Sequence, residues 1–203
     1  MWAARGGNIR VLKYLIEAGS DVTLRDRFGK SMMLCGAFGG SVRVVEHLIH
    51  ACGQDVHDLN TQGWNAFAWA VLKNHERLAL HLVAKYGVAT DLLDRDQKNA
   101  LLLCAERGHA PLLAVLLREF PGLSLAQRDS KGNTALHLAV VRAGVDCIDL
   151  IMGTGAVDYA ATNDAGYTAA EAARLKDRPD IAARIEAHPT SAFFAVSWML
   201  ASM

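Results

Sequence analysis

The chain has 203 residues, which is room for one domain of ordinary size or for a short repeat array. Hydrophobic residues make up 52% and charged residues 21%, so the chain can bury a sizeable core and is not expected to be disordered. Lys plus Arg and Asp plus Glu both number 21, and this balance excludes a bulk electrostatic attraction to nucleic acid or anionic membranes, although not a local charged patch. With 7% aromatics and only 4 Pro, the composition favours helices over a β-sandwich.

The internal repeat is the strongest signal in the sequence. A turn position recurs at intervals of 34 or 35 residues, at Gly29, Gly63, Gln97, Gly132 and Gly166. Each turn is followed by a segment with a small or apolar pair. A second segment then carries apolar residues at i, i+1, i+4 and i+5, as in Val44-Val45 and Leu48-Ile49. That spacing is one face of an α-helix, so each copy is predicted to contain two helices.

Helix-capping residues agree with this register. Two positions after each turn stands a side chain that can cap a helix start: Ser31, Asn65, Asn99, Thr134 and Thr168. The second helix of each copy is predicted to end near a left-handed glycine, at Gly19, Gly53, Gly87, Gly122 and Gly155. Gln97 replaces the turn glycine in one copy, and its hairpin is expected to distort if that position needs a positive φ.

These residues resemble the ankyrin-repeat family, whose period is 33 and whose signature is T-P-L-H-x-A. Residues 134–139 read T-A-L-H-L-A, and Gly108-His109 and Asn74-His75 are similar to the family's inter-helix turn. The signature proline is absent from every copy, and its histidine survives only as His137. The resemblance covers residues 3–187.

The resemblance implies an all-α solenoid of stacked helix-turn-helix units joined by β-hairpin-like loops. Stability in such an array comes from stacking on neighbouring repeats. We expect about six repeats, the first of them truncated, at about 1–26, 27–60, 61–94, 95–129, 130–163 and 164–187. An apolar tail at 188–203 follows the array.

Function in this family is expected on the concave face, at the hairpin tips and the ends of the first helices. In this sequence, 27 slots correspond to the positions that line the concave face in the family. They hold ten basic and three acidic residues, although the chain as a whole is neutral. The alternative is that hairpin tips and helix ends simply collect Lys and Arg; the size of the charge asymmetry favours a functional surface. The candidate partner-binding residues are Arg27, Phe28, Lys30, Trp64, Lys73, Arg95, Lys98, Arg107, Lys131, Arg142 and Tyr167.

Aromatic residues in the same slots are candidate anchors, because aromatics and Arg are enriched at interface hot spots. Phe28 and Trp64 are predicted to lie on hairpin tips and to point outward. Phe38 and Leu72 are open to two interpretations: they line an apolar pocket with a basic rim, or they pack between repeats.

No catalytic or metal motif emerges. Gly153-Thr154-Gly155 lacks the third glycine of a phosphate loop and falls at a predicted helix end. His47 and His50 lie three apart without a third ligand at helical spacing, so surface histidines are the better interpretation. Cys104 and Cys147 fall in packing columns. We therefore expect no enzyme activity, no cofactor and no metal.

The leading hypothesis is a non-enzymatic, monomeric, cytoplasmic protein–protein interaction module that binds an acidic or phosphorylated partner segment; nucleic acid is not expected. The four cysteines match no metal motif or disulfide framework and indicate a reducing compartment, and no secretory signal is visible. The alternative is an N-terminal targeting or substrate-recruiting segment of a larger membrane protein or enzyme, such as a membrane acyltransferase or channel. The apolar residues 192–203 could cap the last repeat, pair with another chain, or contact a membrane, and we slightly favour the membrane.

Overall fold

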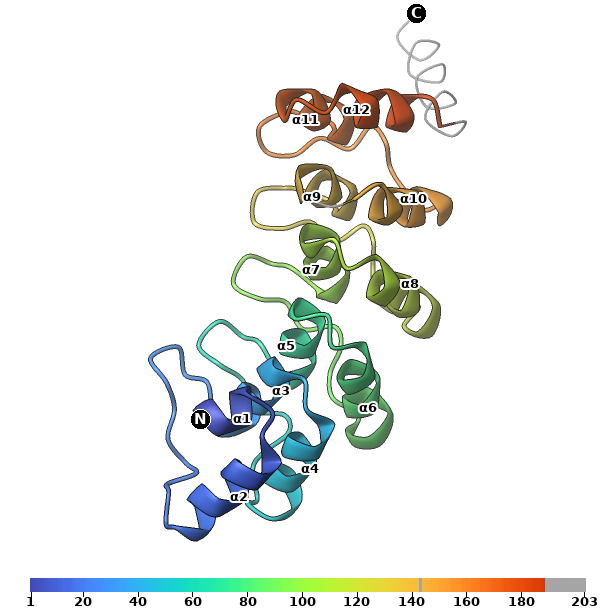
Figure 1. Ribbon diagram of the computed structural model, residues 1–203. Coiled ribbons are helices and arrows are strands. Elements are labelled where there is room, and N and C mark those ends of the chain that lie inside the picture. The colour runs from blue at the N-terminus through green and yellow to red at the C-terminus, as the bar shows by residue number, and fades with distance from the viewer. Residues whose placement is uncertain (143, 189–203) are drawn as a thin grey trace, which may run out of the picture. The chain divides into compact units, whose positions relative to one another are not determined.

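The computed structural model describes residues 1–142 and 144–188 (Figure 1). The predicted tail at 192–203 lies outside the described residues. The chain divides into two compact units, residues 1–95 and 96–203. Every element assigned in the described residues is a helix, apart from a single antiparallel bridge between Thr162 and Thr168, which confirms the predicted all-α class.

The first unit contains three helix pairs. Its helices are α1 (Trp2–Arg5), α2 (Ile9–Glu17), α3 (Met32–Gly39), α4 (Val42–His50), α5 (Ala66–Leu72) and α6 (Glu76–Tyr86). The first helices of the pairs pack side by side, with α3 between α1 and α5, and the second helices stack behind them, with α4 between α2 and α6 (Figure 1). We call these the loop-side layer and the back layer, because the long connections emerge beside the first helices.

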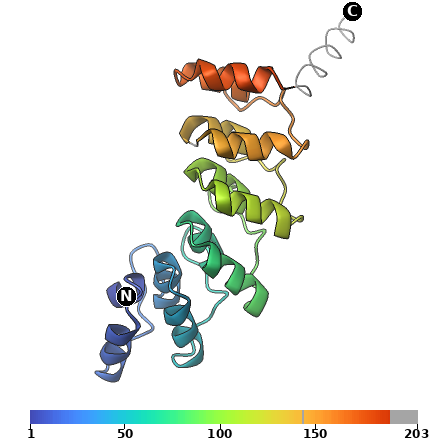
Figure 2. The same ribbon diagram turned by 45° about the vertical axis from the view of Figure 1, so that its right-hand side comes forward.

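The second unit repeats this arrangement (Figure 2). Its helices are α7 (Ala100–Arg107), α8 (Ala110–Glu119), α9 (Ala135–Arg142), α10 (Val145–Gly153), α11 (Ala169–Leu175) and α12 (Pro179–Glu186). In the loop-side layer α9 packs between α7 and α11, and in the back layer α10 packs on α8. No helix among the described residues is long and apolar enough to cross a membrane.

The core of each unit lies between its two layers. The loop-side helices are buried almost all round, as in α3, where Met33 and Leu34 are fully covered. The back helices bury one stripe only, as Val44, Val45 and Leu48 do on α4. Such a helix cannot cover its apolar stripe alone, so its stability depends on the neighbouring pair. The six repeat boundaries themselves stay a prediction.

Four of the five predicted helix caps are confirmed. The side chains of Ser31, Asn65, Asn99 and Thr168 each accept a hydrogen bond from the backbone N–H three residues on. Thr168 also completes a capping box with Glu171. In the fifth copy the Thr134 hydroxyl hydrogen-bonds with His137 Nδ1 at 2.8 Å, which ties the two polar positions of the T-x-x-H signature together.

The turn column adopts one backbone conformation throughout. Its four glycines have φ between 71° and 82°, and Gln97 has φ 61°. Gln97 therefore takes the left-handed conformation of this column although it carries a side chain. Gly122 corrects an expectation: its φ is not positive, because Pro121 ends α8 by a different route, restricting Phe120 to a non-helical conformation (φ −125°).

We predict that Gln97→Gly stabilises the protein by about 1 kcal/mol, because glycine adopts a positive φ without the steric cost that a side chain imposes. The midpoint of urea unfolding measures this. The matched change Gly29→Ala should destabilise, since a Cβ there would lie 2.7 Å from Thr61 Cγ2 at φ 71°. An unchanged or lowered midpoint for Gln97→Gly would show that the left-handed turn carries no strain.

Candidate functional site

The long loops have a rigid internal scaffold. In four of them an Asp or Asn side chain accepts hydrogen bonds from the backbone N–H groups two and four residues on: Asp26, Asn60, Asp129 and Asn163. Neighbouring loops within each unit are also joined, as by Thr61 N–H to the Phe28 carbonyl at 3.1 Å. The side chains at the loop tips are therefore presented by an ordered backbone.

Aromatic and cationic side chains gather on the loop side of the first unit. They come from the end of α1, from the first long loop, and from α3, α5 and their flanks. We call them the Phe38 cluster, and its members are Arg5, Phe28, Lys30, Phe38, Trp64, Trp69 and Lys73.

Three cations surround the Phe38 ring. The Arg5 guanidinium carbon and Lys73 Nζ each lie 4.3 Å from its centroid, and Lys30 Nζ lies 5.5 Å from it. Lys30 Nζ also lies 4.9 Å from Trp69 and 5.4 Å from Phe28. The negative face of an aromatic ring attracts cations, so the rings hold these charges in place.

A backbone contact sets the spacing of this cluster. Gly39 packs so closely on α1 that a Cβ at this position would overlap the carbonyl oxygen of Arg5. This close approach brings the end of α1 against the end of α3. As a result Arg5 reaches the ring of Phe38, the residue that precedes the glycine.

Two indoles form the floor of the cluster. Trp64 and Trp69 meet edge to face with centroids 4.6 Å apart, and Trp69 lies 5.3 Å from Phe38. Trp69 is only 6% exposed, whereas Trp64 is partly exposed. Both Nε1 atoms are buried and have no hydrogen-bond acceptor among the described residues. Unsatisfied buried donors are rare in folded proteins and cost free energy.

The charges of the cluster are only partly compensated. Lys30 pairs with Asp26 at 3.2 Å. Within the described residues, no ion pair is seen for Arg5 or Lys73, nor for Arg27, which stacks on Phe28 at 4.7 Å. The cluster therefore presents an excess of positive charge over a half-exposed apolar surface.

Of the predicted site residues in the first unit, Arg27, Phe28, Lys30 and Lys73 come together in or beside the cluster, and Trp64 joins it through Trp69. Arg95 is exposed, and its backbone N–H donates to the Gln62 carbonyl at 3.2 Å. Phe38 and Leu72, for which the sequence left two interpretations, differ in the structure. Phe38 lies in the cluster, whereas Leu72 is buried and packs in the core.

The predicted site residues of the second unit form no comparable group. Lys98 Nζ is neutralised by Glu106 at 3.1 Å and Asp96 at 3.6 Å. Arg107 and Lys131 are exposed, as is Tyr167, whose carbonyl accepts a hydrogen bond from His137 at 2.9 Å. The side chain of Arg142 lies outside the described residues.

Sequence reasoning missed Trp69 as a site residue. It stands directly before the small pair of its copy, in a column that reads as core, and it is indeed buried. The available signal was its size: the column otherwise holds Cys35, Leu103, Leu138 and Ala172, so an indole there reaches farther than its neighbours.

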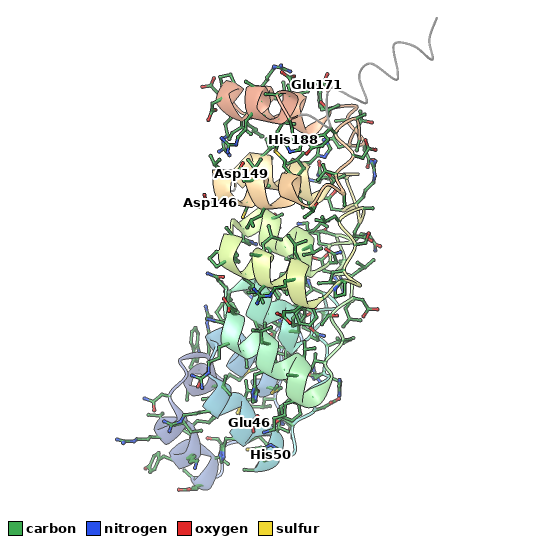
Figure 3. All side chains as sticks on the ribbon, turned by 90° about the vertical axis from the view of Figure 1, so that its right-hand side faces the viewer. Glu46, His50, Asp146, Asp149, Glu171 and His188 are labelled. Atoms are coloured by element: carbon green, nitrogen blue, oxygen red, sulfur yellow. The ribbon has the colours of Figure 1, made fainter. Side chains whose placement is uncertain are left out.

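A polar group in the back layer is centred on Glu46 of α4, which has four hydrogen-bond partners. Figure 3 labels Glu46 and one of these partners, His50. Lys85 Nζ donates to Glu46 at 2.7 Å and the Tyr86 hydroxyl at 2.8 Å, and His50 and His81 also hydrogen-bond with it. Desolvation raises the pKa of Glu46, but the hydrogen bonds from Lys85, His81 and Tyr86 outweigh it and lower the pKa to about 2. This group joins α4 to α6 and is structural.

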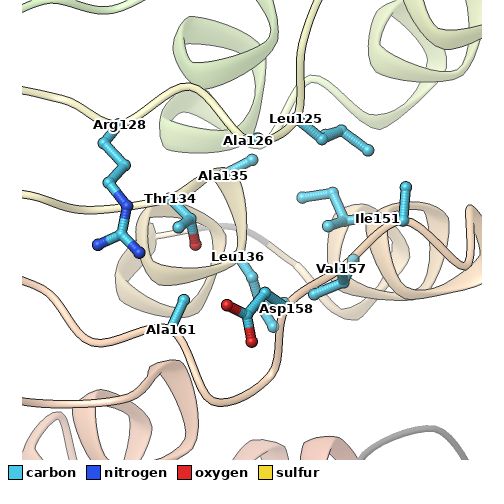
Figure 4. Close-up of a pocket in the computed structure, with 11 residues that line it drawn as sticks. Leu125, Ala126, Arg128, Thr134, Ala135, Leu136, Ile151, Val157, Asp158 and Ala161 are labelled. Atoms are coloured by element: carbon cyan, nitrogen blue, oxygen red, sulfur yellow. The ribbon is translucent and has the colours of Figure 1, made fainter.

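A cavity of about 180 Å³ lies in the second unit between the start of α9, α10 and the adjoining loops (Figure 4). Its lining is mainly apolar, including Leu136 and Ile151. Its polar groups already have partners: the Arg128 guanidinium donates to the Thr162 carbonyl at 2.6 Å, and Asp158 accepts from the Ala160 N–H at 3.0 Å. We therefore place the candidate site at the Phe38 cluster.

Nucleophilic and metal chemistry find little support in the described residues. Cys104 and Cys147 are buried, as their packing columns predicted, and burial raises the pKa of both thiols. No group of three or more His, Cys, Asp or Glu side chains in the described part of the chain is placed to hold a metal ion. His50 is held by Glu46 and by the Tyr86 hydroxyl, 3.0 Å away.

The two indoles should respond differently to truncation. We predict that Trp69→Ala costs about 3 kcal/mol of stability, because it removes a buried aromatic from between repeats. Trp64→Ala should cost about 1 kcal/mol, because that side chain is partly exposed. Urea unfolding of both variants, followed by circular dichroism, tests this order. Equal costs would show that Trp64 is as much a core residue as Trp69.

The group around Glu46 predicts a pH dependence. Because the folded-state pKa of about 2 lies below the ordinary value of 4.5, the carboxylate adds stability above about pH 5, and this is lost as the pH falls toward 2. Glu46→Gln should therefore lower stability by about 1 kcal/mol at pH 7 and have little effect near pH 2. Urea midpoints across this range test it, with Glu17→Gln on exposed α2 as control. A pH-independent difference would contradict the assignment.

Comparison with known proteins agrees with the fold. The family model "Ankyrin repeats (3 copies)" matches residues 1–90 and 80–163. A chain in the solved complex of a predatory endopeptidase with an immunity protein, from Bdellovibrio bacteriovorus, superposes with a TM-score of 0.73. The two share 24% identity over 91% of this chain and 94% of that one, which shows the fold.

Two curated relatives are much longer than the matched region. An L-asparaginase of Dirofilaria immitis is 28% identical over 158 residues, which is 78% of this chain and 26% of the relative. A protein named as a palmitoyltransferase, ZDHHC13 of Danio rerio, is 27% identical over 180 residues, or 88% and 27%. The chain thus spans about a quarter of the length of these relatives. The family match, the helix pairs and the turn register together show that the chain belongs to the ankyrin-repeat family.

Proposed function

We propose that this protein is a non-enzymatic binding module that holds an acidic or phosphorylated segment of a partner protein on the loop side of its repeats. The observation that carries the proposal is the Phe38 cluster. There, three cations surround one aromatic ring, and only Lys30 pairs with a carboxylate in the described residues.

The chemistry of the cluster supports this role in two ways. Exposed cations steer an anionic partner toward the surface and suppress partners of like charge. The half-exposed rings supply apolar contact area, which gives the short-range part of the affinity. Phe28 is 43% exposed and lies beside both Arg27 and Lys30, so it joins the two effects in one residue.

Family membership supports the general kind of function, because ankyrin repeats are protein-binding modules. The proposal also includes that the protein acts in the cytoplasm as a monomer and needs no cofactor. The remaining predicted residues of the loop side would then make secondary contacts with the partner. Because Lys98 is already paired with Glu106, we expect it to contribute less than the cations of the cluster.

A second candidate is that the same surface recruits a partner or substrate for a larger protein. The observation that favours it is the greater length of the relatives. The matched region is only about a quarter of the asparaginase and of the protein named as a palmitoyltransferase. The residues 192–203 would then contact a membrane or a following domain. The sequence that flanks this region in its gene distinguishes the two: a long apolar helix or an enzyme domain favours recruitment.

Charge reversal on the loop side tests the leading proposal. Three baits are compared by affinity purification with quantitative mass spectrometry: the wild type, Arg27→Glu with Lys73→Glu, and the control pair Lys13→Glu with Arg43→Glu. The control makes the same charge change at exposed positions of α2 and α4. We expect to find partners whose recovery falls about tenfold with the Arg27→Glu and Lys73→Glu bait and is unchanged with the control bait, because the first bait has lost its electrostatic steering.

Two further readouts make this experiment specific. Binding of a recovered partner should weaken as salt rises, and the first pair should flatten that dependence. Lys98→Glu should have the smaller effect. A set of partners that is unchanged by Arg27→Glu with Lys73→Glu, in a variant with wild-type circular dichroism, would refute the proposed surface.

A further inference from the structure

We infer that the Phe38 cluster is a site for a phosphorylated side chain of the partner. This inference rests on the proposed function and narrows it, because an acidic segment could also bind through carboxylates alone.

Convergence on a single ring distinguishes this site from a general basic surface. Arg5, Lys30 and Lys73 come from the end of α1, the first long loop and the residue after α5, yet all three charged groups lie within 5.5 Å of the Phe38 centroid. Like charges gathered around one ring repel one another, and the rings offset only part of that repulsion. An anion placed among them would relieve it.

The charge that remains matches a dianion. The carboxylate of Asp26 compensates Lys30 at 3.2 Å, which leaves Arg5 and Lys73 as the two uncompensated cations around Phe38. A phosphomonoester carries about −1.5 to −2 charges at neutral pH, whereas the carboxylate of Asp or Glu carries one. The charge of one phosphorylated side chain therefore matches that of both cations.

Stereochemistry favours the same group. Arg5 and Lys73 both lie over the Phe38 ring but come from two different helix pairs, those of α1 and α5. The two oxygens of a carboxylate lie in one plane, whereas the three terminal oxygens of a phosphate are tetrahedrally spread and can accept from both. Beside these cations stand Trp64 and Trp69, whose buried indole N–H groups have no acceptor among the described residues.

Binding to the full chain is measured with three fluorescent peptide pools of equal length and with random neutral flanks. Their central residue is phosphoserine or phosphotyrosine in the first pool, glutamate in the second and serine in the third. At about 0.15 M salt we expect a phosphorylated pool to bind about tenfold tighter than the glutamate pool. The indole N–H signals of Trp64 and Trp69 should shift in nitrogen–proton spectra on its addition.

Matched variants locate the site. The double variant Arg5→Gln with Lys73→Gln should bind the phosphorylated pool no more tightly than the glutamate pool. The control pair Lys13→Gln with Arg43→Gln removes the same charge and should have no such effect. Phe38→Leu keeps an apolar side chain but removes the ring under the cations, so it should weaken phosphopeptide binding while wild-type circular dichroism is retained.

The contrary outcomes are distinct. If the glutamate pool binds as tightly as the phosphorylated pool and both weaken in the double variant, the inference is wrong and the proposed function stands. If no pool binds more tightly than the serine pool, the inference is wrong. The bait experiment above then tests the proposed function independently. Equal competition by inorganic phosphate, or tighter binding to phosphoinositide-containing vesicles, would also overturn it in favour of a free anion or a lipid surface.

Discussion

The stacking of neighbouring helix pairs is the constraint on which the rest of this structure depends. A back-layer helix such as α4 buries a single stripe, through Val44, Val45 and Leu48, and has no partner for it within its own pair beyond α3. Within each unit, a helix pair must therefore pack directly against its neighbour. The Phe38 cluster is a product of that spacing, because its members come from three successive pairs and meet only when the pairs are stacked.

A second set of contacts fixes the long loops without using the core. Asp26, Asn60, Asp129 and Asn163 each fold a loop around their own side chain, and backbone hydrogen bonds join adjacent loops. These hydrogen bonds are accepted from backbone N–H groups, so most of them do not depend on which side chain the donor residue carries. Structure and recognition overlap in Lys30, which pairs with Asp26, and are otherwise carried largely by different groups of the same loop.

The fold could be predicted from the sequence because its determinants are local and repeated. Capping side chains such as Asn65 and apolar stripes such as that of α4 report on their own helix, and recurrence in register separates them from chance. Gln97 and Gly122 show the limit. Gln97 keeps the positive φ of a column that otherwise holds glycine, whereas Gly122, which was expected to be left-handed, is not.

The site was only partly predictable, for a physical reason. Slot positions identify which side chains face the loop side, and so Phe28, Lys30 and Lys73 were found. They do not show which charges are already satisfied: the ion pair of Lys98 with Glu106 depends on side-chain reach, and Trp69 reads as core because it is core. Whether a charge is paired and how deeply a side chain is buried depend on the surrounding residues in the folded protein, not on the position within the repeat.

The loop scaffold has an evolutionary consequence. A mutation at an outward loop position keeps the backbone hydrogen bonds that the Asp or Asn accepts, so natural selection can change recognition there at less cost to the turn than at the Asp or Asn itself. The same separation makes the loop side a natural scaffold for combinatorial libraries: randomising residues 28, 62, 131 and 165 while holding the Asp and Asn of each loop constant would sample new specificities on an unchanged frame.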